Sequence, residues 1–65
     1  MRRQMRIEDY KRDDIVKVIT DVESFTGYIY DISILEIIWV QTDNDGIMKI
    51  DLNKPGNVEE VRVVG

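Results

Sequence analysis

The residues best suited to chemistry are carboxylates, and the most suggestive group is the run Asp43-Asn44-Asp45-Gly46. Calcium prefers such oxygen ligands, and the glycine fits the sharp turn of the twelve-residue calcium loop. On that alignment the closing position falls on Leu52, so the bidentate carboxylate that completes the site is missing. We therefore expect a hairpin turn without a metal ion, because Asn, Asp and Gly tolerate positive φ.

The other carboxylates form the adjacent pairs Asp13-Asp14 and Glu59-Glu60. Neighbours on a strand point to opposite faces, and general acid–base catalysis needs a buried carboxylate in a cleft. The chain has no histidine to activate Ser24 or Ser33, no cysteine, and glycines too scattered for a phosphate-binding loop. We expect solvated charge, no enzymatic activity, no cofactor and no small-molecule substrate.

The composition predicts a mainly β fold. Ten isoleucines, eight valines and three threonines are β-branched, whereas alanine is absent and leucine occurs twice. Such side chains suit strands better than helices. Alternation and turn residues predict five strands, at 14–20, 25–33, 36–42, 47–52 and 58–64.

The 65 residues allow one small domain. Short strands joined by tight turns favour an antiparallel meander that hides its edges by closing into a barrel. Before it, residues 6–12 lack strand alternation, and Ile7 and Tyr10 are spaced for one helical turn. We expect a short N-terminal helix or turn that packs on the barrel through these two side chains.

One detail of the second strand predicts a bend. Ile29 and Ile32 are three residues apart, so a regular strand would place them on opposite faces. A bulge near Tyr30-Asp31 would turn both inward, and Gly27 suits a crowded, bent strand. Alternatively, Ile32 belongs to a loop that covers the end of the barrel.

Three segments together resemble the SH3-like and Sm-like small barrels: residues 14–20, 25–29 and 37–40. They are similar to the Sm pattern of a first strand, a short turn, and a glycine that opens a long bent strand. The resemblance implies a five-stranded barrel, a ring of subunits, and a regulator or inhibitor among the acidic members. The uridine-binding residues are not carried over, because Ser33 and Ile37 stand at the positions of the family's aspartate and asparagine.

The charge is divided between a basic arm and an acidic body. Residues 1–12 carry five positive and two negative charges, a balance of +3, and residues 13–65 carry four positive and eleven negative, a balance of −7. An acidic body repels phosphate backbones. Arg2, Arg3 and Arg6 nevertheless allow an alternative function, the binding of RNA or single-stranded nucleic acid. Two further interpretations remain: the basic arm is a frayed terminus, or the acidic body mimics nucleic acid.

Four side chains are candidates for a partner-binding surface: Tyr28, Tyr30, Ile37 and Trp39. If Ile29, Ile38 and Val40 face the core, these four share the outer face of neighbouring strands. Exposed aromatic patches mark interaction surfaces. We therefore expect a non-enzymatic module that binds a protein partner or its own copy. The alternative is that the N-terminal segment covers the patch.

The location and assembly of the protein are expectations as well. No stretch approaches the ~20 apolar residues of a membrane helix, and the first residues lack a secretory pattern, so we expect a cytoplasmic protein without membrane contact. Small domains that lack disulfides and metals are often stabilised by self-association. A homo-oligomer is therefore expected.

Overall fold

The structure is a computed structural model that describes residues 5–43 and 46–65. It contains a short 3-10 helix, η1, at Ile7–Asp9, followed by five strands in one antiparallel sheet. The strands are β1 (Ile15–Thr20), β2 (Ser24–Ser33), β3 (Ile37–Thr42), β4 (Ile47–Asp51) and β5 (Val58–Val63). The mainly β class, the five antiparallel strands and the short N-terminal helix are confirmed.

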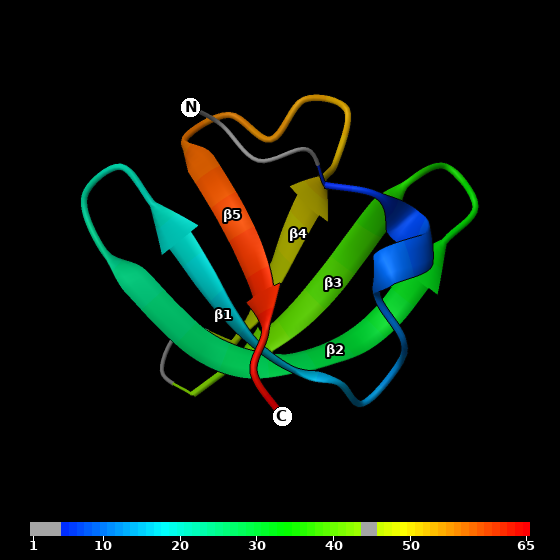
Figure 1. Ribbon diagram of the computed structural model, residues 1–65, viewed down its shortest axis with the longest axis horizontal. Helices are drawn as coiled ribbons and strands as arrows, with labels where there is room; N and C mark the ends of the chain where they lie inside the picture. The colour runs from blue at the N-terminus through cyan, green and yellow to red at the C-terminus, as the bar shows by residue number, and fades with distance from the viewer. Residues whose placement is uncertain (1–4, 44–45) are drawn as a thin grey trace.

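The expected closed barrel is wrong, because the sheet is strongly curled but open. Its strand order is β4-β3-β2-β1-β5, so β4 and β5 are both edges. Figure 1 shows the resulting bowl, in which residues 52–57 carry the chain across the opening from β4 to β5. This connection delivers β5 to the free side of β1, and the ladder that would close the sheet is not formed within the described residues.

The core lies on the concave inner face of the bowl. Alternation along β1 and β3 buries every second side chain, as their sequences predict. The fully buried side chains come from the three central strands and are Val16, Val18, Ile29, Ile38 and Val40. Residues from β4, β5 and the connection between them complete this core, including Ile50, Leu52, Val58 and Val61.

The bend in β2 is a β-bulge, as predicted. Ile29 lies opposite Val40, but the next pair joins Asp31 to Trp39, which leaves Tyr30 as the extra residue. The bulge restores the inward direction, so Ile29 is fully buried and Ile32 packs against the core.

Gly27 explains how β2 and β3 approach each other before the bulge. A Cβ at this position would overlap the backbone carbonyl oxygen of Gln41 and lie 2.9 Å from its carbonyl carbon. The absent side chain is therefore a packing requirement, because the obstacle is backbone of the neighbouring strand.

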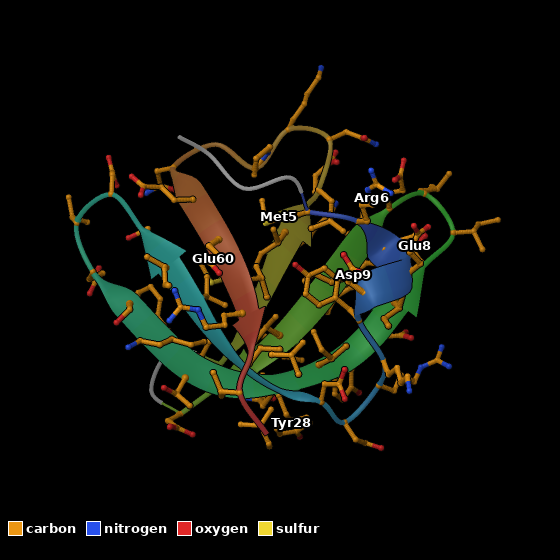
Figure 2. All side chains as sticks on the ribbon, in the orientation of Figure 1. Met5, Arg6, Glu8, Asp9, Tyr28 and Glu60 are labelled. Carbon is orange, nitrogen blue, oxygen red and sulfur yellow. The ribbon has the colours of Figure 1, made fainter. Side chains whose placement is uncertain are left out.

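The N-terminal segment packs on the inner face of the sheet. Tyr10 is buried, and its hydroxyl donates a hydrogen bond of 2.9 Å to the carbonyl oxygen of Val61 on β5. Ile7 and Met5 pack against the same core, and Figure 2 shows Met5 at the open side of the bowl. The predicted packing through Ile7 and Tyr10 is confirmed.

The turns carry the backbone's unusual conformations. The predicted hairpin turn at 43–46 joins β3 to β4, although residues 44 and 45 lie outside the described residues. Gly46 has φ +74°, and its carbonyl oxygen accepts a hydrogen bond from Thr42 N–H at 2.9 Å.

Within the described residues, no helix is long and apolar enough to cross a membrane.

Candidate protein interface

The outer face of β2 and β3 carries the four side chains expected at an interface, here called the aromatic patch: Tyr28, Tyr30, Ile37 and Trp39. Tyr28 is 38% exposed and Tyr30 is 54% exposed. Ile37 and Trp39 are half-buried. Trp39 is therefore neither enclosed in the core nor fully exposed.

The bulge changes how the members of the aromatic patch meet. Tyr28 lies opposite Gln41, whereas Trp39 lies opposite Asp31, and Tyr30 has no opposite residue. Tyr28 and Trp39 are thus diagonal neighbours, a separation that aromatic side chains can span. A regular ladder would have placed Tyr30 where Asp31 lies, so the structure inserts a carboxylate into the patch.

The structure adds a second apolar feature that the sequence analysis missed, a row of side chains across the outer face of the whole sheet. We call it the outer row; in strand order it contains Ile47, Gln41, Tyr28, Ile15 and Val64. Four of its members are exposed large apolar side chains, at 38–51%. The signal was present in the strand alternation, because Ile15 immediately precedes an inward residue, but the register between strands was needed to align the row.

The N-terminal segment does not cover the aromatic patch in the described part of the chain. Ile7 and Tyr10 both pack on the inner-face core, on the opposite side of the sheet. The interpretation that these residues hide the patch is therefore wrong. The physical reason is that the open bowl leaves its own core accessible, and this apolar surface takes up the segment.

An ion pair borders the aromatic patch where the bulge lies. The Arg12 guanidinium donates hydrogen bonds to Oδ1 of Asp31 at 2.6 and 3.0 Å. This contact, followed by the hydrogen bond from the Ile32 N–H, lowers the pKa of the Asp31 carboxyl below its ordinary value of 3.8. The carboxylate inserted into the patch is therefore hydrogen-bonded to both the Arg12 guanidinium and the Ile32 N–H.

Mixed charge lies on either side of the outer row. On β1 and β5, Lys17 lies opposite Arg62, whose guanidinium donates to Glu60 at 3.1 and 3.2 Å. The Glu60 carboxylate raises the pKa of Arg62. On β4, Lys49 lies opposite Trp39. The apolar surface thus has a polar rim of both signs, an arrangement typical of interfaces.

The basic arm is separate from this surface. Arg2 and Arg3 lie outside the described residues. Arg6 is exposed, its Nη1 is 3.7 Å from Oε1 of Glu8, and it belongs to the segment on the inner face. The structure therefore does not join Arg6 to the outer-face tyrosines, as a combined nucleic-acid surface would require.

The carboxylate pairs are engaged in local structure. Asp14 accepts a hydrogen bond from the Lys11 N–H at 3.0 Å, and Glu59 is the extra residue of the irregularity between β1 and β5. Among the described residues, no three His, Cys, Asp or Glu side chains are grouped to hold a metal ion.

The comparisons with known proteins were made at three levels. No protein-family model matches this chain, and no curated protein or solved structure matches it either. A function for this chain therefore has to be inferred from the geometry of its outer face.

Proposed function

We propose that this protein is a non-enzymatic interaction module that binds a protein partner or its own copy through the aromatic patch and the adjoining outer row. The observation that carries the proposal is that the N-terminal segment packs on the inner face and leaves Tyr28 and Tyr30 exposed on the outer face. Binding would remove these rings from water, and aromatic side chains supply much of the energy of protein interfaces.

The charges favour a basic surface on the partner. The protein carries a net charge of −4, which is the sum of −7 on residues 13–65 and +3 on residues 1–12. A net negative charge steers a basic partner toward the protein, and the rim of both signs fixes its orientation. In this proposal the protein acts as a cytoplasmic regulator or inhibitor that occupies a basic binding surface of another protein.

We also propose that the open sheet belongs to the SH3-like or Sm-like group of small β folds. The support is the N-terminal turn before β1, the bulge that follows Gly27 within β2, and the antiparallel order of the strands. A solved structure of the protein that superimposes on this group would support the assignment, and a different strand order would contradict it.

The test of the interface uses Tyr28→Glu, which places a charge at the centre of the outer row. Immobilised wild-type protein would first capture partners, and each captured protein would then be purified. Direct binding would be followed by the emission of Trp39, the single tryptophan, which lies in the aromatic patch. We expect binding to shift the wild-type emission and to be lost in Tyr28→Glu.

Val22→Ser is the matched control. Val22 is an apolar side chain that is 78% exposed in the turn between β1 and β2, outside the patch. This variant should bind as the wild type does. Undiminished binding by Tyr28→Glu, or equal loss in both variants, would contradict the proposed interface.

A further inference from the structure

The two edges of the open sheet differ in how much of their backbone is free. On β5, Val61 lies opposite Val18, and its carbonyl oxygen points away from β1 and accepts the hydrogen bond from the Tyr10 hydroxyl. The same strand is interrupted by the extra residue Glu59. A side chain that occupies the edge and a bulge both hinder the addition of another strand.

The edge of β4 is different. Thr42 N–H donates to Gly46 C=O and Leu52 N–H donates to Glu36 C=O, both at 2.9 Å, at the two ends of the β3–β4 ladder. Hydrogen-bonded pairs alternate along an antiparallel ladder. The N–H and C=O groups of Ile47 and Lys49 must therefore point away from β3, off the edge of the sheet. No hydrogen bond of the described residues beyond that ladder uses them.

We infer that β4 pairs with β4 of a second copy of this chain, antiparallel and about a two-fold axis at Met48. Ile47 of each copy then lies opposite Lys49 of the other. The two symmetric pairs each exchange two N–H···O=C hydrogen bonds. The two five-stranded sheets become one continuous sheet, so edge groups that are otherwise left to solvent are satisfied within the protein.

Registers shifted toward Asp51 are less favourable for reasons visible at the same edge. A two-fold axis at Lys49 would bring two lysines directly opposite each other, which destabilises a strand pair. A shift toward Asp51 would require its carbonyl oxygen, which already accepts a hydrogen bond from the Lys54 N–H at 3.1 Å. The register at Met48 instead places the apolar side chain of Ile47 beside the aliphatic stem of Lys49.

A second copy fits this edge because the pairing extends the outer face, on which the outer row of one copy is followed by Lys49 and Trp39 of the other. Ile47 is the β4 end of that row and is 49% exposed. Side chains at 47 and 49 share the outer face, so the dimer would place both outer rows on one side of the continuous sheet, offset by two residues. Edge pairing uses backbone groups of β4, whereas the proposed function uses side chains of the aromatic patch and the outer row, so each can fail without the other.

The experiment removes one N–H donor at a time with proline and measures mass by sedimentation over a concentration series. Lys49→Pro removes an outward N–H, which an edge strand tolerates, and should abolish the dimer while the circular dichroism of the sheet is kept. Val63→Pro is the matched control, because Val63 lies opposite Val16 and its N–H points off the β5 edge. We expect Val63→Pro and Lys49→Ala to dimerise as the wild type does.

Cross-linking tests the register without depending on how well a proline variant folds. The chain has no cysteine, so Ile47→Cys and Lys49→Cys variants each carry one thiol. An oxidised mixture should give the mixed disulfide in excess over either symmetric disulfide, since residue 47 lies opposite residue 49 of the other copy and neither lies opposite its own counterpart.

The outcomes separate the two proposals. The edge pairing is overturned by a wild type that stays monomeric at every concentration, by a Lys49→Pro variant that dimerises, or by random cross-linking. A dimer that is lost in Tyr28→Glu but kept in Lys49→Pro also overturns it and supports self-association through the aromatic patch. A Lys49→Pro monomer that still binds the captured partner leaves the proposed function intact.

Discussion

The hydroxyl of Tyr10 donates a 2.9 Å hydrogen bond to the carbonyl oxygen of Val61, a residue 51 positions further along the chain. This buried contact ties the N-terminal segment to the edge strand β5. It closes part of the core that the open sheet leaves accessible, and it occupies a backbone carbonyl that would otherwise be free for a neighbouring strand.

Removal of this hydroxyl should weaken the fold. We expect Tyr10→Phe to lower the free energy of unfolding by about 1–3 kcal/mol, because the ring still fills its site while the buried carbonyl loses its donor. Urea unfolding followed by Trp39 emission measures the change. Tyr30→Phe is the control, since Tyr30 is 54% exposed. Equal stability of Tyr10→Phe and the wild type would contradict the role of the hydrogen bond.

Two glycine substitutions should lower the free energy of unfolding by different amounts, because each meets a different obstacle. Gly27→Ala would drive a Cβ into the backbone of Gln41 and force β2 and β3 apart. We therefore expect the free energy of unfolding to fall by about 1–3 kcal/mol or more. Gly46→Ala meets no atom within 4 Å and only strains a φ of +74°, which costs about 1 kcal/mol. Thermal unfolding would rank the variants. The reverse order would contradict the close approach of β2 and β3.

Asp13 offers a stabilising change. Its φ is +73°, a left-handed conformation that glycine adopts without steric cost. We expect Asp13→Gly to raise the free energy of unfolding by a few tenths to about 1 kcal/mol, after the entropy of the unfolded glycine is deducted. Urea unfolding checks the gain. Asp21→Gly, at a turn residue without a positive φ, should be neutral or destabilising, and an equal gain there would contradict the explanation.

The ion pair of Asp31 predicts a pH dependence of stability. Because its pKa is lowered in the folded state, chiefly by the hydrogen bond from Arg12, its contribution is present above the ordinary value of 3.8. The contribution is lost as the pH falls through the lower folded value. In unfolding measured across acid pH, Asp31→Asn should lose stability relative to the wild type at neutral pH and converge with it at the most acidic pH. A constant difference would argue against this linkage.

Substitution of Trp39 tests whether the aromatic patch belongs to the protein surface or to the core. Because its ring lies half-buried on the outer face, we expect Trp39→Ala to remain folded, with a loss of about 1–2 kcal/mol, and to lose binding at the patch. Circular dichroism would report folding, and a tyrosine-based or labelled binding assay would replace the missing emission. Unfolding of the variant would show that Trp39 is part of the core and that the patch is assigned wrongly.

Local sequence signals were sufficient for most of the secondary structure. β-branched alternation placed all five strands, because side chains on a strand alternate between its faces whatever the partner strand is. The spacing of Ile29 and Ile32 predicted the bulge at Tyr30 for the same reason. The spacing of Ile7 and Tyr10 likewise predicted a segment that packs on the core, since two apolar residues at helical spacing share one face.

The long-range features depended on how the strands meet. Whether the sheet closes is set by the path of residues 52–57, which brings β5 to β1 without pairing it to β4, and no local pattern encodes that path. The outer row exists only because the register aligns Ile47, Tyr28 and Ile15 across strands. Residue types determined which side chains could face outward, and the pairing of distant strands determined which of them became neighbours and which backbone edge was left open.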